Sequence, residues 1–164
     1  MKKYGFLLFA AVAAVLSIVA AIMLVSGGGI LRNDYLLQPK YVLFGAPFED
    51  KAGLFHISVD LFNLSAVALS AWILIIAGAL VCVLATVLGL GKKRRHLRYV
   101  ALFGALLLIV GGAMVFFVPQ HFARVNRFET NGVAWKLHGS WIFAAVAALI
   151  SGGSAVLAGL LGKK

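Results

Sequence analysis

Residues that could do chemistry are few, and they lie between the apolar runs of the chain. His56, His121 and His138 would have to converge to bind a metal or a haem. Asp60 and Glu129 would form an acid–base pair if one of these histidines stood beside them. Nothing in the spacing brings these residues together, and no H-x-x-x-H pair occurs. We therefore expect no metal, no cofactor and no enzymatic activity.

Other reactive motifs are missing or incomplete. No serine stands in a G-x-S-x-G nucleophile motif, and the glycine run at 27–29 lacks the strand and the lysine of a phosphate-binding loop. The single cysteine, Cys82, lies inside an apolar run and has no second thiol in the chain to pair with. Thiol-redox chemistry of the paired-cysteine kind is thereby excluded.

The composition requires a lipid environment. Of the 164 residues 63% are hydrophobic and 12% are charged, against roughly 45–50% and 25% in soluble domains. A soluble fold of this size could not bury so much apolar surface. The net charge of +10 invites a nucleic-acid interpretation, which we reject because the basic residues stand at the ends of apolar runs rather than along one face.

Four uncharged runs are long enough to cross a bilayer, which needs about 20 residues per helix. A single membrane domain over residues 1–164 is predicted, and its spans cover residues 4–31, 61–91, 99–120 and 137–162. Helices are expected because lipid leaves no partner for unpaired backbone groups. The first run exceeds the core of a signal peptide, which favours an uncleaved span over a cleaved leader.

The charges predict the orientation of the spans. Nine of the 15 Lys and Arg residues lie in 2–3, 92–98 and 163–164, without an acid among them. The loops 32–60 and 121–136 hold the other six basic residues and all five acids. Basic residues beside short loops stay in the cytoplasm. We therefore expect a multi-pass protein of the plasma membrane with both termini and the loop 92–98 in the cytoplasm.

The inner loop carries a basic cluster. We interpret it as a topology anchor that also attracts anionic headgroups; the alternative is a docking site for a cytoplasmic protein. The residues of this anchor are Lys92, Lys93, Arg94, Arg95 and Arg98.

The spans themselves predict a packed bundle. Small residues recur at helical spacing in each span, which favours close helix packing in a membrane. No span holds an ionisable residue near its middle, which argues against ion pathways and driven transporters. The hydroxyl groups in the spans are expected to bond to their own helices; these are Ser17, Ser70, Thr86, Ser151 and Ser154.

The outer loops predict a small antiparallel sheet. Tyr41–Phe44 is rich in strand formers, and Leu54–Leu61 alternates polar and apolar residues. Asn131 and Gly132 form a strong hairpin signal in the second loop. We expect strands from both loops to join as an extracytoplasmic layer on the helix ends. The alternative is a first loop that is unstructured or lies on the membrane.

Aromatic residues crowd this outer boundary. An interfacial belt accounts for part of them, and a patch that meets a partner is the functional interpretation. The candidate partner-binding residues are Tyr41, Phe44, Phe48, Phe55, Phe128 and Trp135.

The layout resembles the claudin-like tetraspan organisation in topology only. It shares four spans, inside termini, a long first outer loop, a shorter second one and an expected sheet above the membrane. Claudins carry a Trp-Gly-Leu-Trp signature and a cysteine pair in the first loop, and this chain has no Trp or Cys there. No functional residue is carried over.

The expected fold is thus an all-α four-helix transmembrane bundle with a small extracytoplasmic antiparallel β layer. The expected function is that of a non-enzymatic interaction, scaffold or accessory subunit, which binds another membrane or envelope protein, or itself, through its outer loops. The bilayer is its other partner, and no nucleic acid is expected. A channel or facilitator for a small or lipidic solute is the first alternative, and an interfacial lipid-acting enzyme is the second.

Overall fold

A computed structural model describes residues 2–26, 31–33, 40–41, 65–90, 96–125 and 135–161. Its four long helices are α1 (Lys2–Ser26), α2 (Ala66–Leu90), α3 (Leu97–Val115) and α5 (Gly139–Leu161). Each contains a stretch of at least 19 residues that is long and apolar enough to cross a membrane. The prediction of a nearly all-helical, four-span, multi-pass membrane protein is confirmed.

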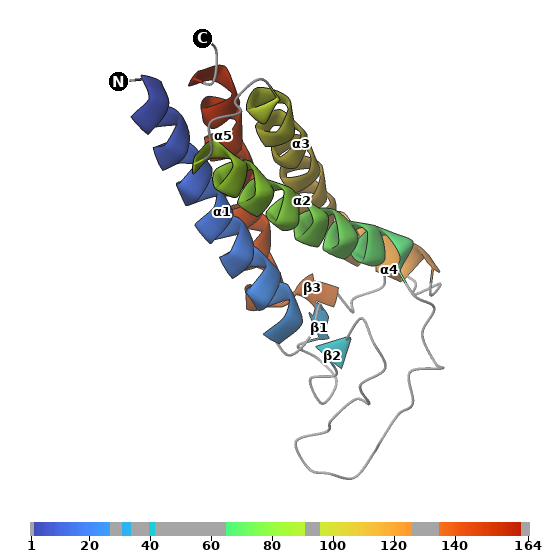
Figure 1. Ribbon diagram of the computed structural model, residues 1–164. Coiled ribbons are helices and arrows are strands. Elements are labelled where there is room, and N and C mark those ends of the chain that lie inside the picture. The colour runs from blue at the N-terminus through green and yellow to red at the C-terminus, as the bar shows by residue number, and fades with distance from the viewer. Residues whose placement is uncertain are drawn as a thin grey trace.

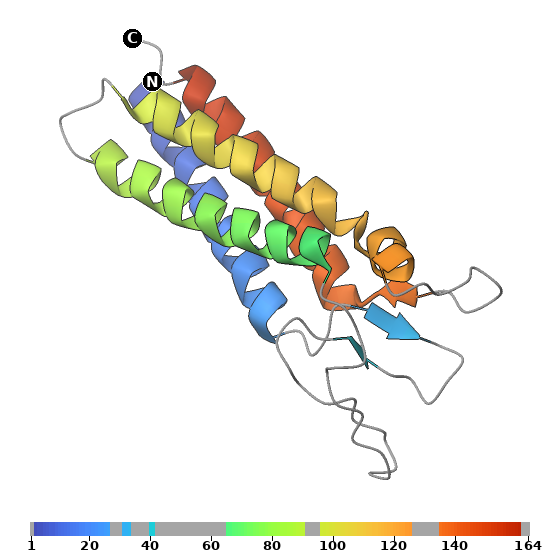
Figure 2. The same ribbon diagram turned by 90° about the vertical axis from the view of Figure 1, so that its right-hand side faces the viewer.

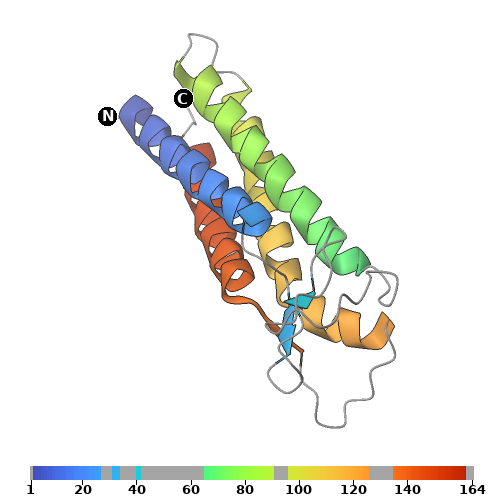
Figure 3. The ribbon, with the colours of Figure 1, turned by 90° about the horizontal axis from the view of Figure 1, so that it is seen from below.

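The helices form an antiparallel bundle. The start of α1, the end of α2, the start of α3 and the end of α5 lie at one end of it (Figure 1). α1 packs against α2 and α5, and α3 packs against the same two helices. Figures 2 and 3 show the four long helices side by side from two further directions. Each helix therefore has two neighbours in the bundle and one face left for lipid.

Several predicted span boundaries were wrong by a few residues. α1 ends at Ser26, and Leu31, which we had placed in the first span, belongs to a strand. α2 begins at Ala66 rather than at 61, and Leu137 precedes the fourth helix in another strand. The absence of charge marks the residues that lipid tolerates. The helix start depends instead on the residue that caps the first free N–H groups.

The third span differs most from its prediction. α3 ends at Val115, and the chain turns at Phe116 and Phe117 into a separate short helix, α4 (Val118–Val125). The N–H of Phe117 donates to the carbonyl of Met114 at 3.0 Å, a tight turn that closes α3. The sequence did not predict this break, because the run from residue 99 to residue 120 contains no charged residue that would mark it.

Glycine seams let the helices approach closely. Gly78 and Gly111 lie in the contact between α2 and α3, and Gly152 lies against α3 from α5. A Cβ atom at Gly111 would stand 2.9 Å from Cγ1 of Ile75, closer than real Cβ atoms come. These positions belong to the small-residue stripes that the sequence predicts. In α1 the buried face includes Ala13.

Two hydroxyl groups tie α1 to its neighbours. Ser151 of α5 donates to the carbonyl of Ala13 at 2.6 Å, and Thr86 of α2 donates to the carbonyl of Ala10 at 2.9 Å. The expectation that the hydroxyls bond to their own helices is confirmed for Ser17, which bonds within α1. Thr86 does so in part, since its hydroxyl also lies 2.9 Å from the carbonyl oxygen of Cys82 in α2. Ser151 instead bonds to α1. In lipid such cross-helix bonds add modestly to helix association, about 0.6 kcal/mol on average.

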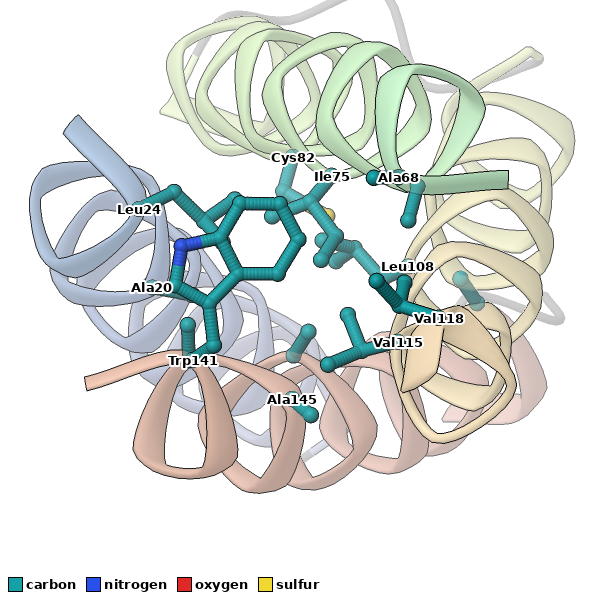
Figure 4. Close-up of a cluster of buried hydrophobic side chains, with 14 of the residues drawn as sticks. Ala20, Leu24, Ala68, Ile75, Cys82, Leu108, Val115, Val118, Trp141 and Ala145 are labelled. Carbon is teal, nitrogen blue, oxygen red and sulfur yellow. The ribbon is translucent and has the colours of Figure 1, made fainter. Parts of the chain in front are cut away.

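The core is filled by apolar side chains from all four spans. Trp141 is 1% exposed, and its indole ring points into the bundle toward Ala20 and Leu24 of α1 (Figure 4). Ile75 and Leu108 are fully buried as well. Trp141 thus fills the end of the bundle at which α5 begins.

Three short strands join segments that are far apart in the chain. They are β1 (Leu31–Asn33), β2 (Lys40–Tyr41) and β3 (Trp135–Leu137). β1 lies in the middle and pairs antiparallel with both others, so that Leu31 is opposite Tyr41 on one side and Leu137 on the other.

These strands do not show the extracytoplasmic layer that the sequence predicts. Tyr41 is the only described residue of the segment Tyr41–Phe44. Leu54–Leu61 and the turn at Asn131 and Gly132 lie outside the described residues. The layer stays a prediction.

Candidate functional site at the loop end of the bundle

The loop end of the bundle is where α1 and α3 finish and α2 and α5 begin. α4 and the three strands lie at this end, away from both chain termini (Figures 1 and 2). α4 contacts α2 and β3, while β1 joins the other two strands. Of the predicted site residues, Tyr41 and Trp135 therefore lie at this end, and Arg98 of the predicted basic anchor lies at the opposite one.

α4 is an amphipathic helix docked on the loop end. Val118 and Phe122 are fully buried, whereas Gln120 and Arg124 on the other side are exposed. Pro119 is its second residue, where a missing N–H breaks no intrahelical bond. Pro119, which lies near the end of the predicted third span, therefore stands in the first turn of a new helix.

α4 is linked to the start of α2 through Ser65. The hydroxyl oxygen of Ser65 accepts a hydrogen bond from the N–H of Ala68 at 3.3 Å, which caps the first turn of α2. The same oxygen lies 3.1 Å from Nδ1 of His121 in α4. Ser65 is fully buried. The side chain of Ser65 thus both caps α2 and contacts α4.

A second histidine caps α5. Nδ1 of His138 accepts from the N–H of Ser140 at 3.4 Å, and the hydroxyl of Ser140 lies 2.9 Å from the same nitrogen. The carbonyl of His138 accepts from the N–H groups of Trp141 and Ile142 at 3.0 and 3.2 Å. His138 is therefore the residue at which the hydrogen-bond ladder of α5 starts.

The two described histidines that were candidates for metal binding or catalysis contact the starts of two different helices. His121 lies beside a serine of α2 and His138 beside a serine of α5. Among the residues whose placement is described, no group of three His, Cys, Asp or Glu side chains comes together. His56, Asp60 and Glu129 lie outside that part of the chain.

Two of the six candidate partner-binding residues are placed. Tyr41 is in β2 and Trp135 is in β3, on either side of the central strand β1. Phe44, Phe48, Phe55 and Phe128 lie outside the described residues.

The sequence did not single out the turn between α3 and α4 as part of the site. Phe116 is 45% exposed and Phe117 is 60% exposed there. The signal for these rings in the sequence was the crowding of aromatic residues at the predicted outer boundary.

The basic anchor is placed in part. Arg98 is the second residue of α3 and is half-buried; its Nε atom is buried, with no hydrogen-bond partner in the described ranges. Lys92, Lys93, Arg94 and Arg95 lie outside these ranges.

The bundle axis is closed where the four helices meet near the basic end. A space between them, too narrow for a water molecule, is lined by Ala10, Ala13, Cys82, Ala85, Ala101, Ala155 and Ala158. Alanine side chains let the backbones come together and leave no polar lining. This part of the axis is dry.

No family model matches the chain, and no curated protein matches it. Function must therefore be inferred from the residues and their geometry.

Proposed function

We propose that the protein is a non-enzymatic accessory subunit, which binds another membrane or envelope protein through the loop end. The main support is the way this end is built. α4 and the strands β1 and β3 bring segments from three parts of the chain together, and the contact between Ser65 and His121 ties the start of α2 to α4. An ordered platform of this kind positions loops for recognition.

The proposed orientation places the loop end outside and the basic end in the cytoplasm of the plasma membrane. The charge asymmetry between the two ends supports it, since all five acids belong to the loops 32–60 and 121–136. Arg98, together with Lys92, Lys93, Arg94 and Arg95, then meets anionic headgroups of the inner leaflet. Each such residue contributes about 1 kcal/mol near the surface.

The proposed contact surface is aromatic. Tyr41 and Trp135 stand in the outer strands of the sheet, and we place Phe44, Phe48, Phe55 and Phe128 in the same surface. Aromatic side chains are enriched at protein interfaces because they bury large areas with few rotatable bonds. The extracytoplasmic β layer would hold this surface above the bilayer.

A solute pathway along the bundle axis is less favoured. The space among the alanines is too narrow for water, and Trp141 fills the loop end of the axis (Figure 4). A channel or facilitator would need a continuous passage from the space among the alanines to the loop end, lined by groups that suit its solute.

Site-specific photo-crosslinking in native membranes tests the proposal. A photoreactive amino acid at Tyr41 or Trp135 should yield one discrete protein adduct. Phe143, which is 68% exposed on the apolar surface of α5, is the matched control and should yield lipid adducts only. The proposal fails if neither Tyr41 nor Trp135 yields a protein adduct at native expression, or if Phe143 yields the same adduct as they do.

A further inference from the structure

The lipid-facing side of α3 continues into the turn that follows the helix. Large exposed side chains recur on α3 at steps of four and three residues, which places them on one helix face. They include Tyr99, Phe103, Leu106 and Val110. Phe117 follows seven residues after Val110 and is exposed, as is Phe116 beside it. The apolar surface that α3 presents to lipid therefore extends as far as the start of α4.

The turn comes where the hydrocarbon of a bilayer would end. α3 has 19 residues, so at a rise of about 1.5 Å per residue it is about 28 Å long, close to the hydrocarbon thickness of about 30 Å. From Val100 to Pro119 the chain contains no polar side chain, and Gln120 is the first that follows. A straight continuation of α3 would carry Gln120 and Arg124 out of the membrane, one turn above the other.

α4 leaves the direction of α3 at this turn. Figures 2 and 3 show α4 running across the end of α3 rather than along its axis. Val118 and Phe122, the buried side of α4, face protein, since the helix packs against α2 and β3. Gln120 and Arg124 are exposed, one helical turn apart. Because α4 crosses the bundle axis, these two polar residues lie at similar distances from the centre of the membrane.

We propose that α4 lies flat in the phospholipid headgroup layer at the loop end, with Phe116 and Phe117 at the edge of the hydrocarbon. The occupant of this surface is lipid, because the turn continues the lipid-facing side of α3 and the length of α3 matches the hydrocarbon. Interfacial helices place Phe at the acyl boundary and basic residues such as Arg124 among the headgroups.

This lipid contact is separate from the aromatic surface proposed for a protein partner. It involves α4 and the turn before it, whereas Tyr41 and Trp135 stand in the strands. It also holds whichever side of the membrane the loop end occupies. Tyr99, which is exposed at the other end of α3, marks the opposite edge of the hydrocarbon.

Spin labels at single cysteines measure the depth of these residues. The full chain with Cys82→Ala is reconstituted in vesicles of phosphatidylcholine and phosphatidylglycerol, and a nitroxide is attached at one position at a time. Collisions with oxygen become more frequent with depth in the hydrocarbon, and collisions with a water-soluble nickel chelate become less frequent. Labels at Phe117→Cys and Tyr99→Cys should be shallow and in contact with lipid, while a label at Leu106→Cys should be deepest.

A second pair of labels tests the direction of α4. Gln120 and Arg124 are one turn apart, so their labels point the same way and should report the same depth if α4 lies flat. A helix that continued the direction of α3 would separate them by about 6 Å. The matched control is the pair Tyr99→Cys and Phe103→Cys, which are also four residues apart and exposed, but on a spanning helix. These two should differ by about 6 Å in depth.

Three results would overturn the proposal. If the label at Phe117 meets the nickel chelate as often as the label at Arg124, the turn lies in water. If it is shielded from both reagents, protein covers the turn, such as a second copy of this chain. If Gln120 and Arg124 differ in depth as much as Tyr99 and Phe103, α4 leaves the membrane. All these side chains are exposed, so the substitutions do not disturb the packing of the bundle.

Discussion

At the scale of single residues, glycines allow the helices to pack closely because they have no side chain. Gly152 of α5 has space for no Cβ atom, which would lie 2.6 Å from Cγ1 of Ile109 and 3.2 Å from the carbonyl oxygen of Ala105. The next residue, Gly153, has no atom within 4 Å of the same position. Two adjacent glycines thus have opposite structural roles.

Gly152→Ala should destabilise the bundle by about 1–3 kcal/mol, because α3 and α5 must move apart. Gly153→Ala, which adds a methyl group on the open side, should leave stability unchanged or raise it by up to about 1 kcal/mol. Cys82 is the only thiol and is buried in α2, so a thiol-reactive dye reports unfolding in detergent. Equal midpoints for the two variants would contradict the proposed contact between α3 and α5.

The sequence predicts these seams better than it predicts their hydrogen bonds. Small residues at helical spacing identify the contact faces of α2, α3 and α5, because close packing in lipid favours them. The partner of Ser151 could not be predicted, since both its own helix and the carbonyl of Ala13 are available to it and only the docked position of α1 decides. For the same reason, the contact between Ser65 and His121 could not be predicted from the sequence.

At the scale of elements, α4 is the piece that the sequence missed. Its apolar residues continue the uncharged run of α3, and no charge marks the turn at Phe116 and Phe117. Pro119 does not locate the break, because a proline suits the first turn of a helix as well as the residues that follow a helix end. Composition predicts that a segment can lie in lipid, whereas the direction of α4 depends on where Val118 and Phe122 are buried.

Phe122→Ala should release α4 from the loop end. Removing a fully buried ring costs about 3–5 kcal/mol, so that amide exchange in α4 should rise by more than about a hundredfold. Phe117→Ala is the matched control, since its ring is 60% exposed, and should change exchange only a few-fold. If both variants behave alike, α4 is not held by the burial of Phe122.

At the scale of the whole molecule, the four spans were predictable because lipid and water impose opposite requirements on charge. The strands were less predictable from the sequence. β1 includes Leu31, which an apolar run assigned to the first span, and β1 pairs with β3 across more than a hundred residues of sequence. Of the candidate contact surface, Tyr41 and Trp135 are placed in strands, and the proposed role of that surface depends on which side of the membrane the loop end occupies.

Sidedness is therefore the central claim, and it is tested by labelling single cysteines from one side of the membrane. In a Cys82→Ala background, Glu49→Cys should react with a membrane-impermeant maleimide in intact cells, while Lys93→Cys should react only after permeabilisation. Reaction of both residues from the same side would contradict the four-span orientation, and with it the roles proposed for the loop end and the basic end.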